Sequence, residues 1–201
     1  MRIAVFVSGR GSNLQALLNS QKERGYFEVK AVFSDKKDCA AFGIAGDHSI
    51  PTYCLGSKDG CISYSDLSAL LTELKIDIIV LAGFLKLIPE DLIKRYSLKI
   101  INIHPALLPA FGGKGMYGLN VHRAVFESAA KVSGPTVHFV DTTYDTGKII
   151  AQKCVDISDV KSPEEIAERV LKAEHELLPF VVEKMASGKV KIIDGRPVIL
   201  N

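Results

Sequence analysis

Short apolar runs alternate with segments of helical periodicity along the chain. Strand-like apolar runs occupy residues 3–7, 29–33 and 78–82, and leucines recur at helical spacing in residues 14–18 and 65–74. Runs that are apolar on both faces, with amphipathic helices between them, are typical of a parallel sheet covered on both sides. The pattern therefore predicts an α/β fold with a doubly wound, mostly parallel sheet.

The second half of the chain predicts further strands at residues 98–104, 137–140 and 148–155, and a helix at 121–130. Between them, residues 109–120 are rich in glycine and have no strong periodicity, which predicts a mobile loop.

A long helix and a hairpin are expected at the C-terminal end. Ser162, Pro163 and Glu165 stand where a helix cap, first helical position and capping glutamate are expected, and this helix should run to Ser187. Residues 189–200 then read as a hairpin. No linker separates the parts, so residues 1–201 are expected to form one domain, with halves 1–100 and 101–201.

Charge and hydropathy exclude several classes of protein. Twenty-five Lys and Arg against 23 Asp and Glu give a net charge of +2, a poor match to a polyanion-binding surface. No apolar run approaches the roughly 18 residues of a membrane span. We expect a soluble cytoplasmic protein, a monomer or homodimer, that binds small molecules and neither nucleic acid nor membrane. Its four cysteines form no C-x-x-C pair, so reduced thiols are expected rather than a zinc site or a disulfide.

A glycine-rich turn, residues 8–13, follows the first predicted strand. Small residues there let backbone N–H groups approach an anion at a helix N-terminus, with Ser12 and Asn13 as further donors. The dinucleotide fingerprint is incomplete, because Leu14 stands at its last glycine position. The turn therefore indicates either a site for one phosphate or a tight turn without a ligand.

Two polar residues share one face at the end of a predicted strand. Strand alternation places Asn102 and His104 together, at the edge where open α/β sheets bind ligands. An amide beside an imidazole suits oxyanion stabilisation and general acid–base catalysis. Asp145 lies in a turn, where it either bonds local backbone or takes part in the chemistry.

Glu174 falls on the apolar stripe of the long C-terminal helix. A carboxylate on a buried stripe needs a partner, such as a cation or an amine ligand, unless it reaches the surface or is paired locally.

Taken together, the motifs resemble the phosphoribosylglycinamide formyltransferases over essentially the whole chain. The matching segments are S-G-R-G-S-N-L-Q (8–15), V-L-A-G-F-L-K-L-I (80–88), I-N-I-H-P-A-L-L-P (101–109), G-P-T-V-H-F-V-D (134–141), Y-D-T-G (144–147) and A-E-H (173–175). The resemblance implies a Rossmann-like formyltransferase fold. It also implies metal-free transfer of the formyl group of 10-formyltetrahydrofolate, the co-substrate, to the amine of 5'-phosphoribosylglycinamide in purine biosynthesis.

Residue roles follow from the same resemblance. Asn102, His104 and Asp145 would be catalytic, with Asp145 raising the pKa of His104 above its reference near 6.5. The remaining assignments are ribonucleotide binding by Gly11, Ser12, Asn13 and Glu174, and folate binding by Leu85, Lys86, Leu87, Ile88 and Asn102. Many members also carry a folate-contacting Arg before the third helix. Residues 59–64 contain none, so either that contact is lost or a neighbour such as Lys58 replaces it.

Three other functions stand as alternatives. Formyltetrahydrofolate deformylase resembles the chain but carries an N-terminal regulatory domain, whereas a strand is expected here from residue 2. Methionyl-tRNA formyltransferase adds a C-terminal RNA-binding domain that we do not expect. A non-catalytic nucleotide-binding domain would account for the glycine-rich turn, but not for Asn102, His104 and Asp145.

Overall fold

The computed structural model describes residues 1–200, and the chain divides into two units, Met1–Ile101 and a second that begins at Asn102. The prediction that the two halves act as one domain stays a prediction. Within residues 1–200, no helix has the length and apolar character needed to cross a membrane.

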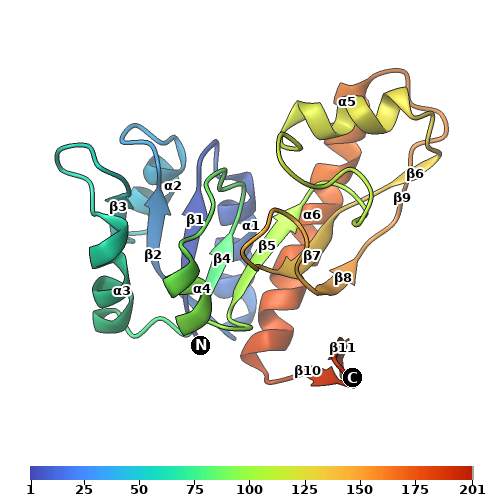
Figure 1. The fold of residues 1–201 in the computed structure, drawn as a ribbon. Coiled ribbons are helices and arrows are strands. Elements are labelled where there is room, and N and C mark those ends of the chain that lie inside the picture. Colours follow the sequence, from blue (N-terminus) through green and yellow to red (C-terminus); the bar gives the residue numbers. More distant parts are fainter. Residues whose placement is uncertain (201) are drawn as a thin grey trace. The chain divides into compact units, whose positions relative to one another are not determined.

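Parallel strands form the sheet of the first unit, in the order β3-β2-β1-β4, and β5 begins beside β4 (Figure 1). The strands are β1 (Arg2–Val7), β2 (Glu28–Ser34), β3 (Thr52–Cys54), β4 (Ile78–Leu81) and β5 (Ile100–His104). All four residues of β4 and five of the six in β1 are buried, because helices cover both faces of the sheet. The α/β class with a mostly parallel sheet is confirmed.

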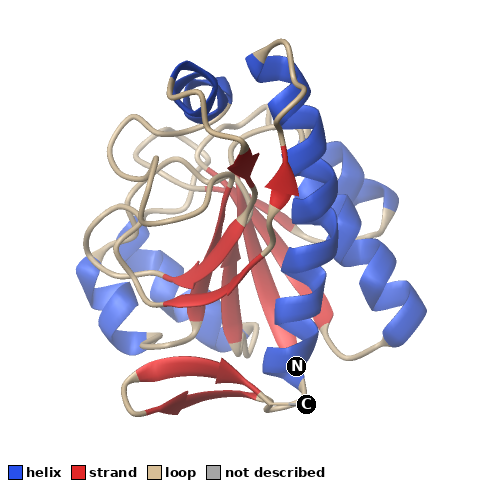
Figure 2. Ribbon diagram, turned by 90° about the vertical axis from the view of Figure 1, so that its right-hand side faces the viewer, coloured by secondary structure: helices blue, strands red, loops and turns tan. Residues whose placement is uncertain are grey.

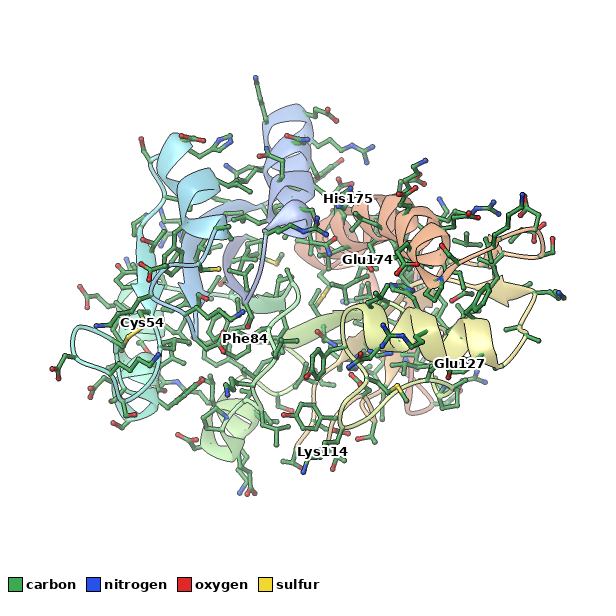
Figure 3. The ribbon with its side chains drawn as sticks, turned by 90° about the horizontal axis from the view of Figure 1, so that it is seen from above. Cys54, Phe84, Lys114, Glu127, Glu174 and His175 are labelled. Atoms are coloured by element: carbon green, nitrogen blue, oxygen red, sulfur yellow. A yellow bond between two sulfur atoms is a disulfide. The ribbon has the colours of Figure 1, made fainter. Side chains whose placement is uncertain are left out.

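The helices of this unit lie two on each face of the sheet. Their bounds are α1 (Ser12–Arg24), α2 (Ala41–Asp47), α3 (Tyr64–Glu73) and α4 (Glu90–Arg95). Figures 1 and 3 show α1 and α2 on one face and α3 and α4 on the other, the doubly wound arrangement. Phe6 lies in the core beside the rings of Phe33 and Phe84, at centroid distances of 4.9 and 5.4 Å.

The second unit contains the end of β5, a set of antiparallel strand pairs and two helices. Its other elements are α5 (Leu119–Glu127), β6 (Val132–Ser133), β7 (Thr136–Phe139), β8 (Ile149–Gln152), β9 (Val155–Asp156), α6 (Pro163–Ala186), β10 (Val190–Ile193) and β11 (Arg196–Ile199). β7 lies between β5 and β8 and pairs antiparallel with β8. The core between α5 and α6 includes Val125, Ile157, Ile166 and Val170.

The long C-terminal helix and the hairpin are confirmed. Ser162 caps α6 by accepting the Glu165 N–H, Pro163 is the first helical residue, and β10 pairs with β11 beyond the C-terminal end of α6 (Figure 2). The single strand predicted at 148–155 is wrong. It divides into β8 and β9, and β9 pairs with β6, where Gly134 lies so close to the Lys153 carbonyl that a Cβ would overlap it.

The expectation of four reduced cysteines is also wrong. Cys54 and Cys61 form a disulfide (Figure 3), whereas Cys39 and Cys154 are free. The cause is local folding that the spacing does not reveal. The loop after β3 turns back, so that the Ile62 N–H donates to the Cys54 carbonyl at 2.7 Å and the two cysteine Cα atoms come within 4.6 Å.

Candidate active site

The end of β5 places Asn102 and His104 on one face of the strand, as the period-two pattern predicts. His104 is 3% exposed. Asn102 Nδ2 lies 3.1 Å from Nε2 of His138 on the adjacent strand β7. The Nδ1 atom of His138 lies 2.8 Å from the Phe139 carbonyl oxygen. Since a carbonyl can only accept, Nδ1 carries the proton, and Nε2 is free to accept an N–H from Asn102.

His104 is held between a carbonyl and a carboxylate. Its Nε2–H donates to the Phe111 carbonyl at 2.9 Å, and its Nδ1 lies 3.5 Å from Oδ2 of Asp145. A protonated ring therefore finds an acceptor at each nitrogen.

Burial nevertheless lowers the pKa of His104 below its ordinary value. Asp145 and the hydrogen bond to Phe111 both act to raise this pKa, whereas His138 lowers it further. The predicted sign of the Asp145 effect is right. The predicted net rise of the pKa is wrong, because the loss of solvent around the ring outweighs the nearby negative charge.

Asp145 is both a turn residue and a neighbour of two imidazoles. Its backbone has a φ of 59°, its Oδ2 accepts the Gly113 N–H at 2.9 Å, and its Oδ1 lies 3.6 Å from His138 Nε2. Burial raises the pKa of Asp145, but its interactions with His138, with the Gly113 N–H and with His104 lower it overall. Asp145 is therefore ionised at neutral pH.

The turn that carries Asp145 depends on two residues that sequence reasoning passed over. Asp141 accepts the Thr146 hydroxyl at 2.8 Å and the Thr143 N–H at 3.0 Å. A Cβ at Gly147 would overlap the Phe139 carbonyl, so glycine lets the turn lie against β7. The motif Y-D-T-G contains Gly147, but the sequence does not show that Gly147 lies against the Phe139 carbonyl.

The loop after His104 is fixed by two polar side chains, the buried Thr136 and the exposed Gln152, that were also missed as site residues. The Thr136 hydroxyl donates to the Ala106 carbonyl at 2.6 Å and accepts the Leu108 N–H at 3.0 Å. Gln152 Nε2 donates to the Leu108 carbonyl at 2.8 Å. These bonds hold the segment whose end presents the Phe111 carbonyl to His104.

A further buried histidine, His122 on α5, lies within electrostatic range of His104. Burial and the neighbouring His104 lower the pKa of His122 to about 4. Its Nδ1 is buried without a hydrogen-bond partner among residues 1–200. His122 is therefore neutral at physiological pH.

The predicted phosphate turn lies in the first unit. Gly11 has a φ of +84°, and a Cβ there would come within 2.7 Å of the Ala41 Cβ, so the turn requires glycine. Gly11 is also the N-cap of α1 and brings no side chain to it. Ser12 and Asn13 begin the helix, which leaves its first N–H groups suited to an anion.

The predicted folate segment follows β4 in the same unit. The side chains of Leu85 and Leu87 are 40% and 48% exposed, and Lys86 is exposed, whereas Ile88 is buried. Exposed leucines suit a flat, largely apolar ring.

The other predicted ribonucleotide residue, Glu174, lies in the second unit, on α6 beside His175 (Figure 3). Its buried position on the apolar stripe is confirmed, since it is 8% exposed.

Known proteins similar to this chain include formyltransferases of purine biosynthesis. The formyl transferase family model matches residues 1–182. The chloroplastic phosphoribosylglycinamide formyltransferase of Arabidopsis thaliana is 44% identical, over 100% of this chain and 70% of that protein. The trifunctional purine biosynthetic protein adenosine-3 of Homo sapiens is 36% identical over 95% of this chain, which spans 19% of it.

Solved structures agree with these relatives. Phosphoribosylglycinamide formyltransferase from Anaplasma phagocytophilum has a TM-score of 0.89 and 34% identity, covering 100% of this chain and 93% of that one. A formyltetrahydrofolate deformylase from Pseudomonas syringae has a TM-score of 0.84 at 24% identity, covering 100% of this chain and 66% of its own. At that identity the deformylase shares the fold alone.

Proposed function

Because this chain belongs to the formyl transferase family, we propose that it transfers the formyl group of 10-formyltetrahydrofolate to the amine of 5'-phosphoribosylglycinamide in purine biosynthesis. The products are formylglycinamide ribonucleotide and tetrahydrofolate. The observation that carries the proposal is the placement of Asn102, His104 and Asp145 within one hydrogen-bonded cluster. This cluster supplies N–H donors and a proton source, which an acyl transfer to an amine requires.

Asn102 stabilises the charge that develops when the amine attacks the formyl carbon. One N–H of its carboxamide is directed at His138 Nε2, and the second is left for the formyl oxygen as that oxygen becomes negative. His138 thus acts as a positioning residue for Asn102. A single donor of this kind is worth roughly 2.7–4 kcal/mol in the transition state.

His104 supplies the proton that the departing folate nitrogen needs, and the proton that the attacking amine loses returns His104 to the imidazolium. Its lowered pKa makes the imidazolium a stronger acid than free histidine, which favours transfer of the proton. Asp145, ionised and 3.5 Å away, keeps the protonated form accessible despite burial. Asp145 therefore offsets part of the cost of burying the ring.

Substrate binding is proposed at three places. The N-terminus of α1, with Gly11, Ser12 and Asn13, holds the phosphate of the ribonucleotide. Glu174 contacts the ribonucleotide from α6. Residues 85–88 hold the pterin ring of the folate, through exposed leucine side chains and backbone groups.

The partners and location proposed for this chain are those of a small-molecule enzyme. The chain acts as a monomer or homodimer in the cytoplasm, and it binds neither nucleic acid nor membrane. Static light scattering of the purified protein at several concentrations distinguishes the two oligomeric states.

A spectroscopic assay for tetrahydrofolate, run with and without 5'-phosphoribosylglycinamide, tests the proposed function. We expect product only when the ribonucleotide is present. Product in water alone would identify a deformylase, and tight nucleotide binding without turnover would identify a binding domain. The Asn102→Ala variant is the control for catalysis by this site, and it should lose turnover by about a hundredfold or more.

A further inference from the structure

Ser8, at the end of β1, makes two side-chain hydrogen bonds to other loops of the first unit. Its Oγ lies 2.6 Å from Oδ1 of Asp35 and 3.1 Å from the Leu85 backbone nitrogen. Because a carboxylate only accepts, the hydroxyl proton of Ser8 is donated to Asp35. A lone pair of Oγ is then available to accept the Leu85 N–H. Ser8 is 3% exposed, so water does not readily replace either bond.

The backbone of Ser8 binds the same segment at a second point. Its N–H donates to the Gly83 carbonyl at 3.0 Å, so bonds from Ser8 lie on both sides of Phe84. The Phe84 ring packs edge-on against Phe6 in the core. The chain is thus fixed up to the Leu85 amide, while the Leu85 side chain remains 40% exposed.

Ser8 is itself held by the loop after β2. Asp35 accepts a hydrogen bond from the Ser8 hydroxyl. In the same loop, the Cys39 thiol donates to the Gly9 carbonyl at 3.3 Å. On this side α2 also approaches Gly11, where a Cβ would come within 2.7 Å of the Ala41 Cβ. The turn that carries the Ser8 hydroxyl is therefore tied to the loop after β2 at two points.

We infer that Ser8 is a positioning residue for the folate segment, residues 85–88, and that Asp35 orients its hydroxyl. The inference rests on the proposed assignment of that segment to folate. Ser8 belongs to the same turn as the predicted phosphate residues, yet its side chain serves the other substrate. It fixes the position and orientation of the Leu85 backbone, and so of the surface against which the pterin ring packs.

Ser8→Ala removes the hydroxyl and keeps the backbone bond to Gly83. We expect the Kd for tetrahydrofolate, measured by calorimetry, to rise about tenfold, because the partly buried Leu85 amide loses its acceptor. Amide exchange followed by NMR should quicken at Leu85. It should stay unchanged at Ala82, whose N–H donates to the Phe6 carbonyl.

Variants of Asp35 test the orienting role. Asp35→Asn keeps an oxygen that accepts the Ser8 hydroxyl, so its Kd for tetrahydrofolate should stay within twofold of wild type. Asp35→Ala lets the hydroxyl turn away, and its Kd should rise about threefold.

Ser20→Ala is the matched control. Ser20 is also a buried serine of the first unit, at 8% exposed, but it lies eight residues, about 12 Å, along α1 from Ser12. Its removal should leave the Kd for tetrahydrofolate unchanged. An unchanged Kd in Ser8→Ala overturns the inference, as does an equal rise in both serine variants. If wild type itself binds no tetrahydrofolate, the proposed function fails, whereas Leu85 exchange still reports whether Ser8 holds the segment.

Discussion

Replacing Asp145 with asparagine separates its charge from its shape. The asparagine oxygen can still accept the Gly113 N–H, now made to Asp145 Oδ2 at 2.9 Å. That neutral oxygen then faces His104 Nδ1, which lies 3.5 Å from Oδ2 in the wild type. The amide nitrogen takes the place of Oδ1, which lies 3.6 Å from His138 Nε2. Without the negative charge, His104 loses the interaction that favours its protonated form. The neutral ring, whose Nε2–H donates to Phe111, is then favoured.

The expected size of the effect follows from this geometry. An opposite charge at such a distance raises a histidine pKa by about one to two units, so Asp145→Asn should lower the pKa of His104 by that amount. Each unit corresponds to about 1.4 kcal/mol. Burial already lowers the pKa of His104 in wild type, so at pH 7.5 the imidazolium is a minor species. Its population, and with it kcat, should therefore fall about 10- to 100-fold.

The assay is kcat against pH for both proteins, with the His104 ring followed by NMR. A lower pKa leaves less imidazolium at each pH, so the basic limb of the profile should move to lower pH. The ribonucleotide KM should change little.

Asp141→Asn is the matched control, since Asp141 holds the same turn through Thr143 and Thr146. It should lower the Tm and leave the pH profile in place. If Asp145→Asn behaves in the same way, with an unshifted His104 titration, then Asp145 is a turn residue and the catalytic assignment is refuted.

Four other outcomes are expected. Asn13→Leu should raise the ribonucleotide KM about tenfold in steady-state assays with little change in the folate KM, and a larger folate effect would reverse the two assignments. In residues 110–120, amide exchange should be slow at Gly113, whose N–H donates to Asp145. Exchange at residues 114–118 should be fast in the free enzyme and slow once both substrates bind. Uniformly slow exchange in the free enzyme would exclude a lid. Thr136→Val should lower the free energy of unfolding in urea by about 2–3 kcal/mol, because two backbone groups lose their partner, and Thr136→Ser should restore most of it. Because the pKa of His122 is lowered to about 4 in the folded protein, His122 is protonated at a higher pH in the unfolded chain than in the folded one. The free energy of unfolding should therefore fall by up to about 3 kcal/mol between pH 6.5 and pH 4. His122→Gln should not show that loss.

The residues that sequence alone placed correctly are those whose position depends on a local period. Alternation along β5 puts Asn102 and His104 on one face whatever the sheet around them does. The same holds for Glu174, which a helical period places on the buried stripe of α6. For the glycine-rich turn, the position between strand and helix followed from the order of elements.

Residues that act through partners distant in the chain were not predictable in this way. Thr136 bonds Ala106 and Leu108, about 30 positions earlier, and neither partner carries a chemical signal of its own. The pairing of Cys54 with Cys61 failed for a different reason. It depends on a reversal of the loop after β3, which no periodicity marks.

The direction of the His104 pKa shows where sequence reasoning reaches its limit. The carboxylate beside the ring was expected from the family resemblance, and the sign of its effect is certain, because a negative charge always favours imidazolium. The cost of burial depends instead on how fully β5 and the following loop exclude water, and at 3% exposure this cost is the larger. The two effects also serve different needs of the reaction. Burial makes the imidazolium a better acid, and Asp145 raises the population of that imidazolium. A catalytic histidine in this setting therefore depends on its carboxylate more than an exposed one would, which is why Asp145→Asn should cost activity rather than stability alone.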